Sequence, residues 1–237
     1  NDATSGVASV TITIYNATDN KYWNGTAWVA SAVQLSVTGT TSWYKNSGLP
    51  TWADTKQYMV NATATDNAGN TGTDSNSFTY DTTAPTSSVD AISPYWKNTS
   101  PLTITATATD GTSGVASVTL YYRYSSDNSS WDGWVSFSTD SSSPWSWSFT
   151  FPNGTGYYEF YTIATDNAGN TESAPGSADE DCGYDYTAPT VTITIPTNGG
   201  YYNSLTNITG TSNDATSGVA SVTITIYNAT DNKYWNG

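Results

Sequence analysis

Residues 156–170 read GYYEFYTIATDNAGN, and this stretch decides the fold. From Tyr158 to Ala164, every second side chain is aromatic or small, and those between them face the other way. A period of two residues is typical of a β-strand with one buried face. The DNAGN segment that follows holds Asp, Asn and Gly, which turns favour. We therefore expect a strand that ends in a tight loop.

The same pattern occurs earlier in the chain. The motif ATDNAGNT stands at 64–71 and again at 164–171, with Tyr58 and Tyr158 at the same distance before it. Immunoglobulin-type sandwiches carry a tyrosine near the start of this strand, whose hydroxyl bonds to the backbone upstream and forms a tyrosine corner. We predict a tyrosine corner at both positions.

Alternation elsewhere predicts further strands, and no segment shows a persuasive helical period. The fold class that we predict is all-β, with tandem immunoglobulin-like β-sandwiches in a linear array. The expected strands are 10–14 and 58–64 in a first unit, and 102–109, 118–122, 134–138, 145–151, 158–164 and a short last strand in a second.

The chain also repeats itself exactly. NDATSGVASVTITIYNATDNKYWNG occupies 1–25 and returns without a substitution at 213–237, which gives a period of 212 residues. Exact repetition at a fixed offset indicates a tandem array. The shorter repeats are SGVASV at 5–10, 113–118 and 217–222, and YD-x-TAPT at 80–86 and 184–190.

These repeats predict two related units in each period. We expect residues 1–84 to be the C-terminal part of one unit, 85–188 a complete unit, and 189–237 the start of the next period. Since both cuts fall inside a unit, we expect neither end to be a natural terminus.

Composition excludes several functions. The chain has 20 acidic and 6 basic residues and a net charge of −14, which disfavours nucleic acid as a partner and suits a cation. It has no histidine, which excludes Ser-His-Asp catalysis and His-ligated metals. No nucleophile–base pair stands out, so we do not expect an enzyme. No apolar run is long enough to span a membrane.

The single cysteine leaves two interpretations open. Cys182 cannot form a disulfide within one repeat. It is either a free thiol in a loop or one half of a bridge between chains.

Aspartates recur in three contexts, and these are the candidate metal ligands. In the first context the aspartate lies between the end of a strand and an SGV segment. In the second it opens the DNAGN loop, and in the third it lies in the YD-x-TAP linker. The members are Asp110 with Asp2 and Asp214 in the first, Asp166 with Asp66 in the second, and Asp81 with Asp185 in the third.

Topology brings one member of each context together. In an immunoglobulin-type sandwich the B–C and F–G loops lie at the same end, where the chain also enters strand A. Asp81, Asp110 and Asp166 should therefore meet. Carboxylates this close repel unless a cation lies between them, and oxygen ligands with Asn167 and Asn170 nearby suit calcium. The alternative is that each Asp only forms a turn with its own backbone.

The tryptophans and the Asn-x-Ser/Thr sequons each have a structural and a functional interpretation. The tryptophans could form a sugar-stacking platform, or they could belong to the core: Trp23, Trp28, Trp43, Trp52, Trp96, Trp131, Trp134, Trp145 and Trp147. Asn-x-Ser/Thr sequons mark sites of possible N-glycosylation on an exported chain, although chance explains most of them: Asn16, Asn24, Asn61, Asn98, Asn128, Asn153, Asn207 and Asn228.

The D-x-TAP-T junctions, the SGV-x-SV segments and ATDNAGNT together resemble bacterial and archaeal Ig-like tandem repeats of surface proteins, adhesins and stalks. The resemblance covers every unit and implies calcium at domain junctions through Asp81, Asp110 and Asp166. The stretch 156–170 looks especially like archaeal surface proteins.

The function that we expect is a structural segment of an extended extracellular filament or cell-surface stalk, with junctions stiffened by calcium. Its partners would be neighbouring repeats or copies of itself. The alternative is a carbohydrate-binding or cell-adhesion module that takes surface glycans.

Overall fold

The computed structural model of the chain describes residues 5–235. Its contacts form two compact units. The first comprises residues 1–87, 108–118 and 163–173, and the second comprises residues 88–107, 119–162 and 174–237. The predicted domain boundaries after residues 84 and 188 remain predictions.

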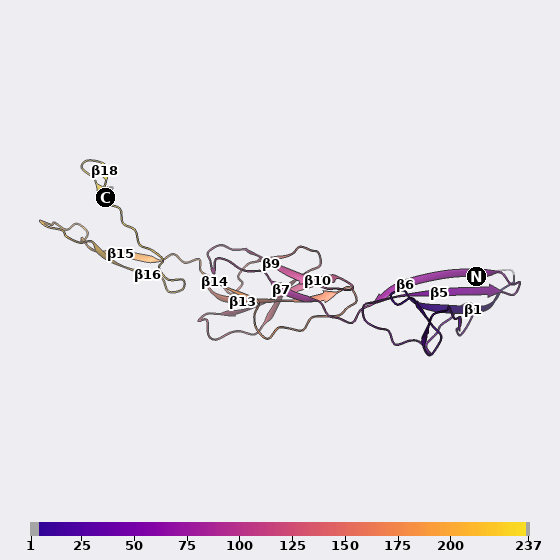
Figure 1. The fold of residues 1–237 in the computed structure, drawn as a ribbon. Helices are drawn as coiled ribbons and strands as arrows, with labels where there is room; N and C mark the ends of the chain where they lie inside the picture. Colours follow the sequence, from indigo (N-terminus) through magenta and orange to yellow (C-terminus); the bar gives the residue numbers. More distant parts are fainter. Residues whose placement is uncertain (1–4, 236–237) are drawn as a thin grey trace. The chain divides into compact units, whose positions relative to one another are not determined.

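Residues 7–80 form a single antiparallel sheet with the order β3-β2-β1-β5-β6, and β4 pairs with β1. Figure 1 labels the three long strands β1, β5 and β6 of this sheet. The ten-residue β1 pairs along its whole length with β5, with Ile12 opposite Ala62 and Ile14 opposite Val60. The strands are β1 (Val7–Asn16), β2 (Lys21–Trp23), β3 (Trp28–Val29), β4 (Leu35–Ser36), β5 (Lys56–Asp66) and β6 (Thr71–Tyr80).

One face of this sheet holds the core of the first unit. Ile12, Ile14 and Leu35 are buried together, because alternation places the two isoleucines of β1 on the same side. Trp28 stacks on Tyr58 at 5.8 Å between ring centroids and covers part of this face.

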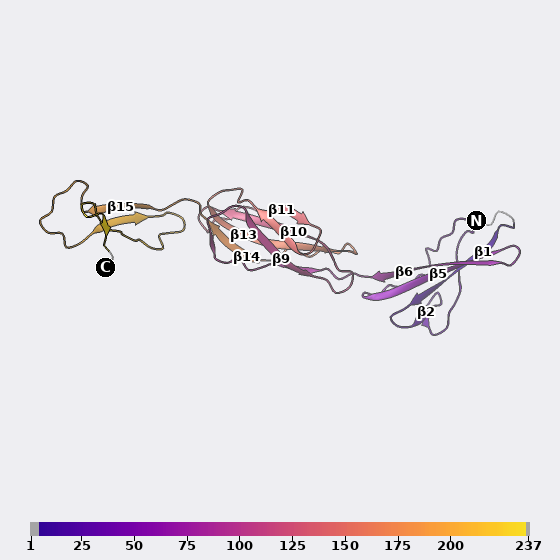
Figure 2. The ribbon, with the colours of Figure 1, turned by 90° about the horizontal axis from the view of Figure 1, so that it is seen from above.

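The middle of the chain forms two sheets. The first has the order β12-β9-β7 and the second the order β11-β10-β13-β14-β8, part of which is seen in Figure 2. The short β8 pairs with β14 in parallel. The strands are β7 (Thr86–Val89), β8 (Trp96–Lys97), β9 (Leu102–Thr109), β10 (Val115–Ser125), β11 (Val135–Asp140), β12 (Trp145–Phe149), β13 (Gly156–Asp166) and β14 (Glu180–Tyr184).

Aromatic rings fill the core that these sheets share in the second unit. The burial of β12 alternates strictly, so that Trp145, Trp147 and Phe149 face inward. Phe149 is fully buried and meets Phe160 edge to face at 5.0 Å between centroids. Such contacts add to the free energy of simple apolar burial.

Two pairs of short strands follow. β15 (Thr190–Ile195) pairs with β16 (Thr209–Asn213), and β17 (Tyr227–Asn228) pairs with β18 (Lys233–Tyr234). The all-β fold is confirmed, and each strand predicted in the first two units lies within or overlaps an observed strand.

Both tyrosine corners are confirmed. The hydroxyl of Tyr58 accepts a hydrogen bond from the backbone N–H of Ala53 at 3.0 Å. The hydroxyl of Tyr158 accepts one from Asn153 N–H at 3.1 Å and donates one to the Gly154 carbonyl at 2.8 Å. The hydroxyls thus bond to the segment just before the strand, as they do in immunoglobulin-type sandwiches.

We expect Tyr158→Phe to lower the free energy of unfolding by about 1–3 kcal/mol, because it leaves a buried donor and acceptor without a partner. Tyr58→Phe removes one hydrogen bond, that from Ala53 N–H, and should lower the free energy of unfolding by less. Urea unfolding of both variants measures the difference. Equal stability of Tyr158→Phe and the unsubstituted chain would contradict the assigned bonds.

Cys182 is a free thiol, but it lies buried in β14 and not in a loop as predicted. Burial raises the pKa of this thiol to about 12, so little reactive thiolate is present at neutral pH. A bridge between chains would require β14 to open.

We therefore expect iodoacetamide to label Cys182 slowly in the native chain and rapidly after unfolding in urea. Mass spectrometry of the alkylated protein measures both rates. Fast labelling of the native chain would show that β14 is not closed over the thiol.

Candidate metal centre

Three aspartates of the first unit converge as predicted. Asp81 follows β6 in the linker, Asp110 follows β9, and Asp166 ends β13. One carboxylate oxygen from each lies within 4.8 Å of the others. We call this group the acidic cluster.

The loop after β9 is organised by Asp110. Its Oδ1 accepts hydrogen bonds from the backbone N–H groups of Thr112, Ser113 and Gly114 at 3.0, 2.8 and 2.7 Å. Gly114 has a φ of 78°, a left-handed conformation that favours glycine. None of these three bonds involves Oδ2, so that oxygen is not used in holding the loop.

The DNAGN loop is organised in the same way by Asp166. Its Oδ1 accepts bonds from Ala168 and Asn170 N–H at 2.9 and 2.8 Å, and Gly169 turns with a φ of 95°. Asn167 donates to the carbonyls of Ser113 and Gly114 at 2.8 and 3.0 Å, which ties the two loops together.

Asp81 connects the linker to both loops. Its Oδ1 accepts a bond from Thr83 N–H at 3.0 Å, and its Oδ2 accepts one from Ser113 N–H at 3.0 Å. Its carbonyl accepts a bond from the Asn170 amide at 3.2 Å. Asn167 and Asn170 therefore lie near the acidic cluster as predicted, and their amide Nδ2 groups donate the bonds that fix the loops.

Two of the three aspartates in the acidic cluster are buried, and within residues 5–235 no Lys or Arg side chain pairs with the cluster. Asp81 and Asp166 are only 8% and 2% exposed. Within residues 5–235 the ion pairs of Lys and Arg side chains are Lys56–Asp19 and Arg123–Glu159, neither of which reaches the cluster. Buried carboxylates normally have a partner charge or coordinate a metal.

An orphaned polar atom lies at the same place. The hydroxyl oxygen of Ser113 is buried and makes no hydrogen bond, while the N–H of the same residue bonds to both Asp81 and Asp110. A buried polar atom without a partner is rare and calls for a ligand or water. Carboxylates and a hydroxyl are hard oxygen donors, so the residues fit calcium.

Asp166 stays ionised despite its burial. Burial alone would raise its pKa, but hydrogen bonds from the side chain and backbone of Asn170, and from backbone N–H groups of Gly169 and Ala168, together lower it. The oxygens of Asp166 are therefore charged and able to bind a cation at neutral pH.

Asp66 repeats the loop of Asp166. Its Oδ1 accepts bonds from Ala68 and Asn70 N–H at 2.8 and 2.7 Å, and Gly69 has a φ of 89°. The predicted counterpart of Asp110 beside it, Asp2, lies outside the described residues.

Asp185 and Asp214 repeat the pair of Asp81 and Asp110. Oδ2 of Asp185 accepts a bond from Ser217 N–H at 3.2 Å. Oδ1 of Asp214 accepts bonds from the N–H groups of Ser217 and Gly218 at 2.8 and 2.9 Å. Over the described ranges, the acidic cluster is the one group in which three carboxylates meet.

Asp54 is a participant that the sequence did not indicate. Its Oδ1 accepts a bond from Thr82 N–H at 2.8 Å, and its Oδ2 accepts one from the Thr83 hydroxyl. These bonds hold the linker next to Asp81. The repeats give no signal for Asp54, because the residue four positions before the second corner tyrosine, Tyr158, is Gly154 and not an aspartate.

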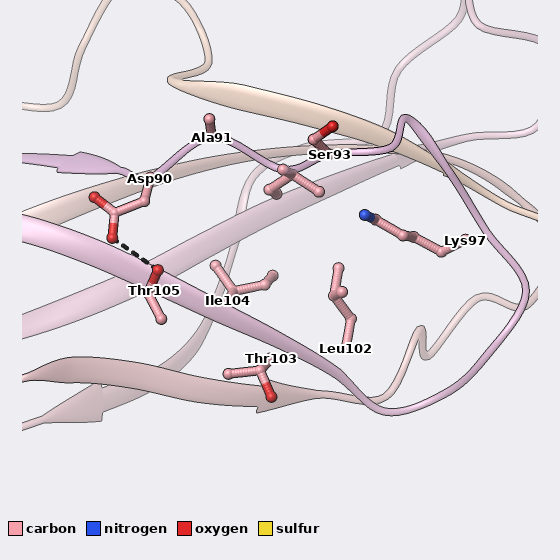
Figure 3. A pocket seen from close by; sticks show the side chains of 9 residues that line it. Asp90, Ala91, Ser93, Lys97, Leu102, Thr103, Ile104 and Thr105 are labelled. Atoms are coloured by element: carbon pink, nitrogen blue, oxygen red, sulfur yellow. Dashed lines mark hydrogen bonds between the residues drawn. The ribbon is translucent and has the colours of Figure 1, made fainter.

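The hollow shown in Figure 3 is small and polar. It has a volume of about 100 Å³ and lies between the Asp90–Ser93 segment, Lys97 and the start of β9. Asp90 accepts a bond from the Thr105 hydroxyl at 2.7 Å, which closes one side. Pockets for small molecules are roughly 300–1,000 Å³, so we assign no ligand to this hollow.

The tryptophans do not form a platform. Of the nine candidates only Trp43 is exposed, Trp145 and Trp147 are buried, and the rest are half-buried. Trp131 and Trp134 enclose the Arg123 guanidinium at 5.1 and 4.7 Å from their ring centroids. These nine tryptophans therefore do not form a sugar-stacking surface.

The sequons differ in exposure. Asn16 is 4% exposed and its amide bonds to Asp19, so a glycan there would disrupt the β1–β2 turn. Asn61 is half-buried. The others are exposed: Asn24, Asn98, Asn128, Asn153, Asn207 and Asn228. Their glycosylation stays a prediction.

Two models of known protein families match parts of this chain. The model of the bacterial Ig domain matches residues 95–170, and that of the bacterial Ig-like domain matches residues 2–82. No curated protein matches the chain. In the part of the chain that the structure describes, no helix is long and apolar enough to cross a membrane.

A solved structure, the tetra-tandem repeat in the extending region of a large adhesion protein, is similar at 19% identity with a TM-score of 0.39. The match covers 82% of this chain and 46% of that one.

Proposed function

Since the chain is a tandem of bacterial Ig-like domains, we propose that it is a structural segment of an extended extracellular filament or surface stalk, in which calcium stiffens the junctions between domains. The observation that carries the proposal is the acidic cluster. Its three carboxylates come from a linker and from two loops, and no Lys or Arg side chain within the described residues pairs with them.

Different residues hold the three carboxylates of the junction in place. Backbone N–H groups fix Asp110 and Asp166 through one oxygen each, and Asp54 holds the linker that carries Asp81. A calcium ion would supply the positive charge that these groups lack and would bind the linker to both loops at once. Without it, repulsion between carboxylates favours their separation.

A surface location follows from the same proposal. Bacterial Ig-like domains are typically structural or adhesive modules and not enzymes, and we propose the outside of the cell as the place where this one works. Millimolar calcium is common there, and extracellular calcium modules work at such concentrations.

Stiffness is tested with spin labels. Ser75→Cys in β6 and Ser138→Cys in β11 place one label on an exposed strand position in each unit, while buried Cys182 stays unlabelled. We expect one narrow distance distribution in 2 mM calcium, as roughly an extracellular level, and a broad one after chelation.

Asp110→Asn provides the control. It keeps the Oδ1 that holds the loop but removes a charge, so the distribution should be broad under both conditions. If chelation leaves the distribution of the unsubstituted chain unchanged, calcium does not stiffen the junction.

A further inference from the structure

One edge of β7 lies against side chains and not against another strand. β7 is the last strand of its sheet, and β9 pairs with its inner edge. Residues 172–179, which connect β13 to β14, form no strand. An unpaired strand edge leaves backbone N–H groups without partners, which is unfavourable where they are buried. The outer edge of β7 therefore needs acceptors of another kind.

The carboxylate of Asp179 is such an acceptor in the second unit. Its Oδ2 accepts hydrogen bonds from Val89 N–H in β7 at 3.0 Å and from Thr162 N–H in β13 at 3.1 Å. β7 and β13 belong to different sheets, so a single oxygen fastens one sheet to the other. Val89 and Thr162 are both buried, and a buried N–H that loses its acceptor is costly.

Glu172 makes the same arrangement in the first unit. Its Oε1 accepts a bond from Ser87 N–H of β7 at 2.9 Å. Its Oε2 accepts bonds from the Ser87 hydroxyl and from Ala164 N–H of β13, the latter at 3.1 Å. Hydrogen bonds to an ionised acceptor are about twice as strong as neutral ones. We call the carboxylates of Asp179 and Glu172 the carboxylate clasp.

The clasp joins the strand by which the chain enters the sandwich to the segment by which it leaves. The linker that carries Asp81 leads directly into β7, and Asp179 comes directly before β14. A second acidic side chain follows the same pattern, since Oε2 of Glu180 accepts a bond from Ile92 N–H at 3.3 Å. Entry and exit segments are thus bonded to each other through side chains.

β8 and β14 continue this connection with backbone bonds. They pair in parallel, with Trp96 opposite Gly183, and Asp185 N–H donates to the Lys97 carbonyl at 2.8 Å. In a parallel pair the two strands begin at the same end. A pull on the start of the entry segment and on the end of β14 therefore acts in opposite directions along the strands, and it loads their bonds together and not one after another.

We propose that the carboxylate clasp bears load when the array is under tension, a role that rests on the proposed function as a segment of a stalk. Tension in the linker reaches β7 before any other strand of the sandwich. β7 can move only when the N–H groups of Ser87 and Val89 leave their carboxylates. The clasp then sets the force at which the sandwich opens.

Unfolding at constant force in optical tweezers tests this role. Ala84→Cys and Ala188→Cys, both exposed, attach the handles before β7 and after β14, while buried Cys182 stays unmodified. In chelator, Asp179→Asn is expected to unfold about tenfold faster than its parent at the same force, because a neutral amide replaces a charged acceptor. Glu172→Gln should accelerate unfolding in the same way.

Asp140→Asn is the matched control. Asp140 also accepts bonds from two backbone N–H groups, those of Ser142 and Ser146, but these lie in the turn between β11 and β12 and not in β7. Its unfolding rate under force should equal that of the parent.

A second direction of pulling separates a load-bearing role from a general loss of stability. Handles on Thr103→Cys and Ser138→Cys, both at exposed strand positions, enclose neither β7 nor the clasp. In this direction Asp179→Asn should unfold at the rate of its parent. Equal rates in the first direction, or equal acceleration in both, would overturn the proposal. Since all rates are measured in chelator, a failure of the calcium proposal would leave this result unchanged.

Discussion

Calcium is expected to raise the free energy of unfolding of this chain. The increase should be about 2.7 kcal/mol when the calcium concentration is one hundred times the dissociation constant, and about 4.1 kcal/mol when it is one thousand times that constant. The reason is that an ion bound only by the folded acidic cluster stabilises the folded state by mass action. Thermal unfolding in calcium and in chelator measures this difference.

The Asp110→Asn variant sharpens this prediction because it should reverse the order of stabilities. Its side chain keeps the Oδ1 that accepts three N–H bonds and loses one negative charge. In chelator it should be at least as stable as the unsubstituted chain, since repulsion falls; in calcium it should be less stable.

Asp127→Asn is a suitable control. Asp127 accepts N–H bonds from Ser129 and Ser130 in a similar turn but lies outside the acidic cluster. Its effect on stability should be equal with and without calcium. An equal response of Asp110→Asn would mean that the cluster only forms turns.

The same substitution should be strongly destabilising in one copy of the repeated segment and nearly neutral in the other. Ile14→Ala is expected to lower the free energy of unfolding by about 2–5 kcal/mol, because it removes buried methyl groups and leaves a cavity. Ile226→Ala should change it by at most about 0.5 kcal/mol, as an exposed substitution does.

Urea unfolding of both variants makes the comparison. The flanking residues are identical, so local propensity cancels. Equal destabilisation would show that residues 217–226 are packed in the isolated chain, contrary to the structure.

This pair also shows where sequence reasoning ends. Alternation predicted β1 and its inward isoleucines, and the turn residues explain why both copies form a hairpin. Whether the segment becomes a strand depends on a neighbour that is distant in sequence. Local pattern alone therefore could not predict that Ile224 is exposed.

The acidic cluster was predictable for a different reason. The recurrence of Asp at three strand ends, with the topology of an immunoglobulin-type sandwich, was enough to bring Asp81, Asp110 and Asp166 together. The donor roles of Asn167 and Asn170 depend on which way each amide points. Asp54 does not recur, so the repeats contain no signal for it.

Direct titration of calcium into the chain, followed by calorimetry, is the measurement closest to the central claim. The account predicts one calcium site, matching the one group of three carboxylates in the described residues, and its loss in Asp110→Asn. No heat of binding, or equal binding by Asp110→Asn and the unsubstituted chain, would contradict it.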